Sequence, residues 1–550
     1  MSLVVYNTLS RTKEPFAPVK PGHVGIYLCG PTVYKPSHVG HAVGPIIFDA
    51  IKRYLVHRGY KVTWVVNITD VDDKLIVEAA KQGISTFALA EKVTADYLSA
   101  MKLLHVDGID IMPKASEHIG EIIAIISRLV EKNHAYVSGG DVYFDVTSDS
   151  DYGKLSNRRI EEQEGQRDLQ SGEKRSAGDF ALWKAAKPDE PAEVKFDSPW
   201  GPGRPGWHIE CSAMASRYLG ETFDIHGGGL DLIFPHHENE VAQSESASGK
   251  PFVKYWLHNG LTRVNTKKIS KSDASPEMQA ALAKMTLHTL LKTYPPELIR
   301  YFVLSTHYRR PIEYSEEEID SKRKGLDTFY RLFERVERLC AQSPYSSEPR
   351  TSVRADSGNR QSPIANRQLA ESSDRAYAAF VESMDDDFNT AGAIAAMFDF
   401  AGAINRFIES EKLETEPRTS VPATREGEAP AEPQSEPRAQ VSDSLGRATG
   451  GSISTATVRE RGWTPTIANV LSATTDLIGL GRLIGIFIDP QKKAGVSDAV
   501  ADKAMQVLIA IRQHLRKKKD FESADLLRNM LAEKKITLED RPDGTLWRAE

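Results

Sequence analysis

The sequence predicts an α/β fold in which a parallel sheet is followed by a helical region and a small α+β unit. Three observations indicate this fold class. Strand, helix and strand patterns follow one another near the N-terminus, helical patterns dominate beyond Ser315, and two helix patterns precede a hairpin pattern at the C-terminal end. A chain of 550 residues is too long for one hydrophobic core, so we expect several domains.

The first unit has a β-α-β pattern. Val24 to Cys29 is an apolar run typical of a buried strand, and His38 to Tyr60 carries apolar residues at helical spacing. Lys61 to Thr69 is rich in β-branched and aromatic residues and is predicted to be the second strand. Two such strands joined by one helix favour a Rossmann-like parallel sheet with right-handed crossovers.

Residues 115–200 are predicted to form an insertion into this sheet domain. They contain a helical pattern from His118 to Lys132 and short strand patterns from His134 to Asp145. We expect the sheet to resume with a strand at Trp207 to Ser212 and to continue past Tyr255 to His258.

The second half is predicted to be helical and interrupted by two low-complexity segments. Ser315 to Leu339 is helical in pattern and heavily charged. Segments 343–366 and 414–462 are rich in Pro, Ser, Thr, Glu and Arg, so they bury too little apolar surface to fold. We interpret them as disordered loops between helices; a partner-binding tail is the alternative.

The last unit begins after Asp498. Helical patterns cover Ala501 to Arg516 and Phe521 to Glu533, and two short strand patterns flank the turn at Pro542 to Gly544. We expect two helices and a small hairpin.

Composition narrows the class of protein. The apolar fraction of 40% and charged fraction of 27% are ordinary for globular proteins. We find no apolar run of about 18 residues and no signal-peptide pattern at the N-terminus, so we expect no membrane span. Cys29, Cys211 and Cys340 are too few for a disulfide framework and favour a reducing cytoplasm. The net charge of −6 does not favour nucleic-acid binding, although Arg512 to Lys519 is a local basic patch.

A phosphate-binding helix start is predicted at His38-Val39-Gly40-His41. Backbone N–H groups at a helix start attract anions, and the rings of His38 and His41 can donate to phosphate oxygens in a transition state. Gly40 has no side chain, which lets an adenine ring pack against the backbone. Four residues alone are weak evidence, since such a pattern also arises by chance.

A lysine-rich loop is the second candidate element. Lys268-Ile269-Ser270-Lys271-Ser272 lies in a polar stretch between apolar segments. Two lysines on a loop suit a clamp on a leaving pyrophosphate, where charge develops in the transition state. Alone it is also typical of any solvated basic loop; the order H-x-G-H then K-x-S-K-S makes chance a poor explanation of both.

A metal site is the third candidate. His236 and Glu240 are four residues apart, so a helix places them on one face. With Cys29 and Cys211 they form a Cys₂-His-Glu set suited to Zn²⁺. His237 and Glu238 are rival ligands that a regular helix would point about 100° away. Two buried free thiols beside a polar helix are the alternative.

Together these elements closely resemble cysteinyl-tRNA synthetase, a family of class I aminoacyl-tRNA synthetases, over most of the chain. HVGH and KISKS match the family's "HIGH" and "KMSKS" motifs. Further matches are YLCGPTVY (Tyr27 to Tyr34), NITDVDDK (Asn67 to Lys74), GRPGWHIECSAM (Gly203 to Met214), FDIHGGGLDLIFPHHENE (Phe223 to Glu240), MDDDFNT (Met384 to Thr390) and LEDRPDGTLWR (Leu538 to Arg548).

The resemblance implies an activity and the residues that perform it. The family makes cysteinyl-adenylate from L-cysteine and ATP with Mg²⁺, then transfers cysteine to the 3′ end of tRNA(Cys). Its zinc ligands fall on Cys29, Cys211, His236 and Glu240, and its ATP-binding second lysine falls on Lys271. The positions around its amino-acid pocket fall on Thr69, Trp207 and His226. Its glycine-rich adenosine loop falls on Gly227, Gly228 and Gly229, with Asp231 near the ribose.

The resemblance also implies three domains and a monomeric cytoplasmic enzyme. Residues 1–313 would be the catalytic domain, with Lys268 to Ser272 as its lysine loop, 314–490 the helical bundle, and 498–550 the anticodon-binding domain. The tRNA contacts expected there are Arg512, Arg516, Lys517, Lys518, Lys519 and Trp547.

The chain departs from the family pattern after the lysine loop. Ile269 replaces the usual Met, and Asp273-Ala274-Ser275-Pro276 replaces the usual Leu-Gly-Asn that follows Ser272. Two alternatives stay open. A ligase that couples cysteine to an amino sugar would share the adenylation chemistry but need no anticodon-reading unit. A non-catalytic tRNA-binding paralogue would have no use for a pyrophosphate clamp.

Overall fold

The structure is a computed structural model of the chain. It describes residues 2–158, 174–264, 267–268, 286–341, 363–413, 465–488, 525, 528, 536–541 and 544–549. Side chains are described in these ranges except at 264, 267–268, 341, 363–366, 465 and the two C-terminal strands.

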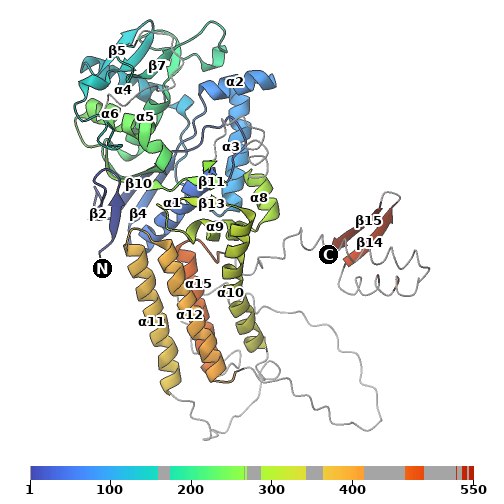
Figure 1. Cartoon of the computed structure of the whole chain (residues 1–550). Helices are drawn as coiled ribbons and strands as arrows, with labels where there is room; N and C mark the ends of the chain where they lie inside the picture. Colours follow the sequence, from blue (N-terminus) through green and yellow to red (C-terminus); the bar gives the residue numbers. More distant parts are fainter. Residues whose placement is uncertain are drawn as a thin grey trace, which may run out of the picture.

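A four-stranded parallel sheet forms the centre of the N-terminal half (Figure 1). Its strands are β3 (His23–Leu28), β4 (Lys61–Val66), β9 (Phe223–Gly229) and β10 (Val253–Asn259), in the spatial order β10-β9-β3-β4. Helix α1 (Gly40–His57) connects β3 to β4. The predicted β-α-β unit and its parallel sheet are therefore confirmed.

The order of the strands fixes where a ligand can bind. From β3 the chain crosses to β4 on one side, and β9 later pairs with β3 on its other side. At such a switch point the loops beyond the carboxyl ends of the strands diverge and leave a crevice. The residues that follow β3 and β9, beginning with Cys29 and Leu230, lie at this edge.

The inserted subdomain contains a second, antiparallel sheet, packed with helices at one end of the molecule (Figure 1). Its strands are β5 (Ala135–Ser138), β6 (Asp141–Phe144), β7 (Phe180–Ala185) and β8 (Gly203–Pro205). Helices α4 (Ile119–Glu131), α5 (Trp207–Leu219) and α6 (Glu238–Ser248) contact one another beside it.

The expected strand at Trp207 to Ser212 is wrong, because these residues begin α5. Residues His208 to Ala215 of this helix are all buried, since it packs against α4, α6, β3 and β7. A helix buried on every side carries no apolar stripe, so its periodicity does not separate it from a buried strand.

The N-terminal half contains further helices and strands. They are β1 (Val4–Asn7), β2 (Thr12–Pro15), α2 (Asp73–Gln82), α3 (Thr86–Leu103), α8 (Leu287–Thr293) and α9 (Pro296–Leu304). Short turns of 3-10 or π helix cover Ala115–Glu117, Val146–Ser148, Ala192–Val194, Leu230–Leu232 and Ile233–His237. A small sheet joins β11 (Thr262–Val264) to β12 (Lys267–Lys268) on one side and to β13 (Ile312–Tyr314) on the other.

Four long helices form a bundle at the end of the molecule opposite the inserted subdomain (Figure 1). They are α10 (Glu316–Ala341), α11 (Pro363–Asp385), α12 (Thr390–Ser410) and α15 (Pro465–Leu483). Residues 363–366, expected in the first disordered segment, belong to α11. The rest of both low-complexity segments lies outside the described residues.

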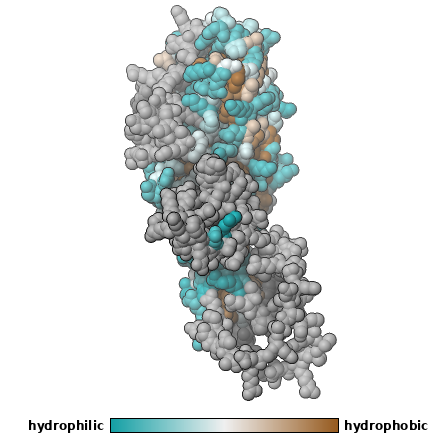
Figure 2. Space-filling view, turned by 90° about the vertical axis from the view of Figure 1, so that its right-hand side faces the viewer, coloured by the Kyte–Doolittle hydropathy of each residue, from teal (hydrophilic) through white to brown (hydrophobic). Residues whose placement is uncertain are grey.

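Helix α12 is long enough to cross a membrane, and an 18-residue stretch of it has a mean hydropathy of 1.2, which is apolar enough to do so. Half of this stretch is buried inside the protein, where α12 packs against α11 and α15. A core helix of a bundle passes the same test, so this composition is weak evidence for a span. The face shown in Figure 2 is largely hydrophilic where it is described, and its hydrophobic residues form small separate groups.

The predicted C-terminal hairpin is present. β14 (Ile536–Arg541) pairs antiparallel with β15 (Gly544–Ala549). The two helices expected before it lie outside the described residues, apart from helical backbone at Asp525 and Arg528.

Candidate functional site

A cavity of about 360 Å³ opens at the carboxyl edge of the central sheet, at the switch point between β3 and β9. It brings together segments that lie far apart in the sequence. Its lining includes Cys29, Gly30, Tyr34, His38, Gly40, His41, Lys74, Trp207, Gly228, Gly229, Asp231, Asn259, Gly260 and Thr262. Both halves of the predicted ATP site that the structure describes, HVGH and the glycine-rich segment, therefore face one cavity.

The HVGH residues lie at the start of α1. Gly40 N–H donates to His38 Nδ1 (3.1 Å), and His41 N–H donates to the His38 carbonyl (2.9 Å). The two imidazole rings are 4.0 Å apart between centroids. A Cβ on Gly40 would lie 2.9 Å from the His38 ring, so glycine is needed here for the histidine to fold back over the helix start.

The glycine-rich segment is the end of a strand and not a loop. Gly227, Gly228 and Gly229 are the last residues of β9, and Asp231 follows in a 3-10 turn. A Cβ on Gly228 would lie 2.7 Å from the His237 ring. The absence of side chains therefore lets this strand end pass between the cavity and the histidines behind it.

The lysine loop is described only at its first lysine. The backbone of Lys268 in β12 pairs with Arg263 in β11. Ile269, Ser270, Lys271 and Ser272, and the altered segment after them, lie outside the described residues. The start of the loop is thus attached to β11, whose residue Thr262 lines the cavity.

The four predicted metal ligands come together beside this cavity. The Sγ atoms of Cys29 and Cys211 are 3.8 Å apart, and Glu240 Oε1 lies 3.6 Å from Cys29 Sγ. His236 Nε2 lies 3.1 Å from the same Glu240 oxygen. All four ligand atoms lie within 4.8 Å of one another. They come from separate parts of the fold: Cys29 follows β3, Cys211 lies in α5, and His236 and Glu240 lie in the π turn before α6 and in α6 itself.

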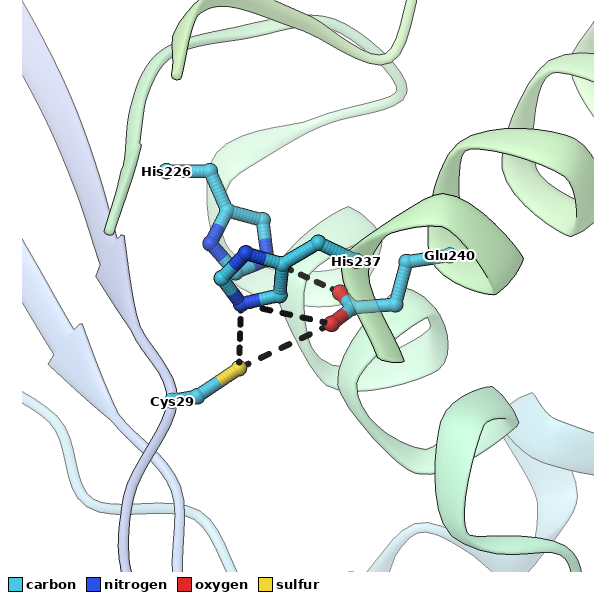
Figure 3. Close-up of side chains that lie close together, drawn as sticks. All are labelled: Cys29, His226, His237 and Glu240. Carbon is cyan, nitrogen blue, oxygen red and sulfur yellow. Dashed lines mark hydrogen bonds and ion pairs between the residues drawn. The ribbon is translucent and has the colours of Figure 1, made fainter. Parts of the chain in front are cut away.

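A second possible donor set shares two of these residues. Cys29, His226, His237 and Glu240 also lie within 4.8 Å of one another (Figure 3). His237 Nε2 is 3.3 Å from Cys29 Sγ, and His226 Nε2 is 2.8 Å from Glu240 Oε2. The expectation that His237 points away is wrong, because Ile233–His237 is a π turn and His237 is three residues from Glu240, a spacing that also shares a helix face.

Burial controls the protonation of the cluster. It raises the pKa of the Cys29 thiol, and the hydrogen bond and negative charge of Cys211 raise it further. The hydrogen bond from Cys29 lowers the pKa of Cys211, but burial and the Glu240 carboxylate outweigh it and the net shift is upward. Burial lowers the pKa of His236 to about 3. The imidazole is therefore neutral, and the thiols need a nearby cation to ionise.

Neighbouring side chains orient the His236 ring so that its Nε2 atom faces the other ligands. His208 Nδ1 lies 2.9 Å from His236 Nδ1, which leaves His236 Nε2 toward Glu240. The Trp207 ring stacks on His236 with centroids 4.2 Å apart. Ligands held from behind in this way are typical of metal centres in proteins.

The residues predicted around the amino-acid pocket are divided between the cavity and the layer behind it. Trp207 lines the cavity. Thr69 and His226 are buried behind the wall, where Thr69 Oγ1 donates to Glu210 Oε2 (3.2 Å) and His226 pairs with Glu240. Their predicted roles in binding the amino acid stay predictions.

The loop after β3 is held by residues to which the sequence pattern assigned no role. Asn67 Oδ1 accepts from the Gly30 N–H (2.8 Å), and a Cβ on Gly30 would lie 1.6 Å from the Asn67 carbonyl oxygen. Behind them lies Glu210, a fully buried carboxyl that burial keeps at a raised pKa. The polar run Asn67 to Lys74 directly after β4 could have pointed to this role. Its first residue, Asn67, holds the loop, and its last, Lys74, lines the cavity.

The expected tRNA contacts are not described. Arg512, Arg516, Lys517, Lys518 and Lys519 lie outside the described residues, and only the backbone of Trp547 is described, in β15.

Two family models match this chain. The model described as tRNA synthetases class I (C) catalytic domain matches residues 15–324, and the DALR domain matches residues 379–420. The first covers more than half of the chain. The chain therefore belongs to the class I tRNA synthetases.

Full-length relatives narrow the class to one family. Cysteine–tRNA ligases of Heliobacterium modesticaldum and Syntrophotalea carbinolica are each 42% identical, with 100% of both chains covered. The cysteine–tRNA ligase of Thermococcus gammatolerans is 41% identical over 100% of this chain and 99% of its own length. The chain belongs to the cysteine–tRNA ligase family.

Solved structures support the fold alone. A methionyl-tRNA synthetase of Mycobacterium tuberculosis bound by methionyl-adenylate is 15% identical, with a TM-score of 0.53 over 86% of this chain and 92% of that chain. The shared architecture agrees with the predicted class I fold.

Proposed function

We propose that this chain performs the ligation for which its relatives are named, joining L-cysteine to tRNA(Cys) at the expense of ATP. In the first step a cysteine carboxylate oxygen attacks the α-phosphorus of ATP, forming cysteinyl-adenylate and releasing pyrophosphate. In the second, the 3′-terminal ribose hydroxyl of tRNA displaces AMP. One observation carries the proposal: Cys29 both lines the cavity beside HVGH and belongs to the metal-ligand cluster.

The residues present fit a zinc ion. Two sulfurs each about 2.3 Å from a tetrahedral Zn²⁺ lie about 3.8 Å from each other. The Cys29 and Cys211 sulfurs are 3.8 Å apart. We therefore favour Cys29, Cys211, His236 and Glu240 as the ligands. In this arrangement His226 holds the second oxygen of Glu240, and His237 lies beside Cys29 without binding the ion.

Zinc at this position would supply selectivity for a thiol. Held by these residues, it would favour a substrate thiolate over the hydroxyl of serine, which is harder and far less acidic. A pocket that relied on shape alone would separate such near-isosteres poorly. Trp207, which lines the cavity and stacks on His236, is positioned to cover the amino acid next to the metal.

The rest of the cavity suits ATP. The N–H groups at the start of α1 and the rings of His38 and His41 provide donors for phosphate oxygens. Gly228, Gly229 and Asp231 form the wall where we place the adenosine, with Asp231 accepting from the ribose. Lys268 and Lys271 would close over the leaving pyrophosphate, with Mg²⁺ bound to the phosphates.

The remaining assignments extend the same proposal. Residues 1–313 serve catalysis, 314–490 form the bundle, and 498–550 bind the anticodon of tRNA through basic side chains and Trp547. We propose a monomeric enzyme. We also propose that it is cytoplasmic, because its three cysteines form no disulfide, as is usual in a reducing compartment.

The acceptor decides between this function and its rivals. Purified chain with labelled cysteine and ATP is offered either bulk tRNA or an amino sugar. We expect acid-precipitable label on tRNA only. Label on the amino sugar alone would replace the tRNA ligase with the amino-sugar ligase, and label on neither would contradict a catalytic function.

A further inference from the structure

The sequence MDDDFNT, Met384 to Thr390, forms the corner between bundle helices α11 and α12. It matched the family pattern, but the proposed chemistry gives it no task. The corner is tightly constrained. Asp387 and Phe388 adopt φ values of +62° and +50°, which residues other than glycine rarely adopt. Such backbone strain persists only where surrounding contacts hold it.

The first contact of this corner is with the helix that carries HVGH. Asp385 is 2% exposed, and its Oδ1 accepts a hydrogen bond from the Tyr54 hydroxyl (2.7 Å) and pairs with Arg58. The Phe388 ring packs edge-on against the Tyr54 ring, with centroids 6.4 Å apart. Tyr54 and Arg58 belong to the last turn of α1 and its C-terminal end, so the corner holds the far end of the helix whose first turn faces the cavity.

The second contact is with the segment between α9 and β13, which follows the lysine loop in the chain. Asp387 is fully buried, and its Oδ1 accepts from the Tyr308 hydroxyl (2.8 Å) and from the Tyr6 N–H (2.8 Å). Its Oδ2 accepts from Arg309 Nε (2.7 Å). The carboxylate thus fixes the Tyr308–Arg309 segment to the bundle and to β1.

That segment is joined in turn to the wall of the cavity. The Gly260 N–H donates to the Tyr308 carbonyl (2.8 Å), and the Ile312 N–H donates to the Leu261 carbonyl (3.0 Å). β13, which begins at Ile312, pairs with β11, and β11 pairs with β12 at Lys268. A continuous set of hydrogen bonds therefore leads from Asp387 to the first lysine of the loop.

We propose that Asp385 and Asp387 are positioning residues that set the distance between the two ATP-binding signatures. Two carboxylates two positions apart, on one strained corner, hold HVGH through α1 and the lysine loop through β13 and β11. ATP spans both signatures, so a small change in their separation weakens its binding and the stabilisation of its transition state. The corner also joins two helices of the bundle, so a movement of the bundle would change the separation of the two signatures.

Asp386 offers a matched control within the same motif. Its side chain is 54% exposed and pairs with Lys13, whose side chain is 41% exposed. An exposed ion pair of this kind contributes little to stability. Replacing Asp386 removes the same charge from the same turn without touching α1 or the Tyr308 segment.

The test measures ATP–pyrophosphate exchange by the full chain and by Asp385→Asn, Asp387→Asn and Asp386→Asn. We expect the KM for ATP to rise about tenfold in the first two and to stay within twofold in the third, with the KM for cysteine unchanged in all. Partial unfolding alone would lower apparent kcat and leave the KM for ATP as it was. An unchanged KM for ATP in both variants, or an equal rise in Asp386→Asn, would overturn the inference.

Milder variants cover the case in which the asparagine variants do not fold. Tyr54→Phe and Tyr308→Phe each remove one hydroxyl donor to the two carboxylates, and the double variant is expected to raise the KM for ATP more than either alone. No rise in any of the three would also overturn the inference. The inference rests on the proposed function; absence of exchange in the unaltered chain would reject that function, whereas these outcomes concern an active chain.

Discussion

The Sγ atoms of Cys29 and Cys211 lie 3.8 Å apart although 182 positions separate the two residues in the chain. β3 ends at one sulfur and α5 carries the other. Burial raises the pKa of Cys29 and contributes to the raised pKa of Cys211, so the protein on its own holds two neutral thiols there. A bound cation would favour the ionised form of both thiols. Each thiol that binds the cation releases a proton, so the number of protons released counts the thiol ligands.

The first prediction concerns protons released on zinc binding. Both thiols are protonated at neutral pH and must lose their protons to bind zinc, while His236 is already neutral because burial lowers its pKa to about 3. We expect release of about two protons, and an affinity that rises with pH by about 100-fold per pH unit. Calorimetry in buffers of different ionisation enthalpy measures the number.

The rival ligand set predicts a different count. Cys29 is its only thiol, since His226, His237 and Glu240 supply the other donors. Release of about one proton, with an affinity that rises only about tenfold per pH unit, would contradict the favoured set.

The second prediction concerns zinc content in variants. Cys211→Ala should lose bound zinc and cysteine activation, because three ligands remain and substrate thiolate has no metal to bind. His237→Asn should retain zinc, since His237 only lies beside Cys29. Cys340→Ala is the matched control, a buried thiol in the bundle helix α10.

Elemental analysis of the three variants after dialysis decides this point. Zinc retained by Cys211→Ala together with its loss from His237→Asn would reverse the ligand assignment. Zinc lost from Cys340→Ala as well would mean that the loss follows general damage to the fold.

The third prediction concerns the pyrophosphate clamp. Lys271→Ala should lower kcat for ATP–pyrophosphate exchange by about 10² to 10³, because the lysine acts on charge that develops in the transition state. His41→Asn should lower it by a similar factor. Stopped-flow measurement of adenylate formation tests both variants. A rise in the KM for ATP with unchanged kcat would contradict this prediction, because it would show that these residues bind the ground state as tightly as the transition state.

The fourth prediction concerns stability. Arg300 is fully buried and donates to Asp49 Oδ2 (2.6 Å) in α1, to the Gly485 carbonyl (2.6 Å) after α15, and to the Leu104 carbonyl (3.1 Å) after α3. Arg300→Met leaves Asp49 with one cation, Arg53, and leaves buried carbonyls without a donor. We expect the free energy of unfolding to fall by about 3 to 5 kcal/mol.

Denaturant titration followed by tryptophan fluorescence measures this change. The matched control is Arg310→Met, at an exposed position, which should alter the free energy by no more than about 0.5 kcal/mol. Equal effects of the two substitutions would contradict the account of Arg300 as a buried connection between three elements.

Local pattern was enough to predict the elements with a distinctive composition or apolar spacing. The β3-α1-β4 unit followed from an apolar run, helical apolar spacing and a run of β-branched and aromatic residues, and the histidines of HVGH followed from their place at a helix start. Helix α5 was misread because all of His208 to Ala215 is buried, which leaves no periodic stripe.

Contacts between distant segments could not be predicted in this way. Asp387 meets Tyr6, 381 positions away, and Arg300 meets Asp49, 251 positions away. Side-chain direction in an irregular turn was equally hidden. His237 reaches Cys29 because a π turn and not a regular helix precedes α6.

The most direct test of the central claim is cysteine-dependent ATP–pyrophosphate exchange on the purified chain, with serine as control and zinc determined on the same sample. The account predicts exchange with cysteine, none with serine, and about one zinc per chain. Equal exchange with serine, or full exchange by a chain that holds no zinc, would contradict the claim that a metal centre at Cys29 selects the thiol substrate.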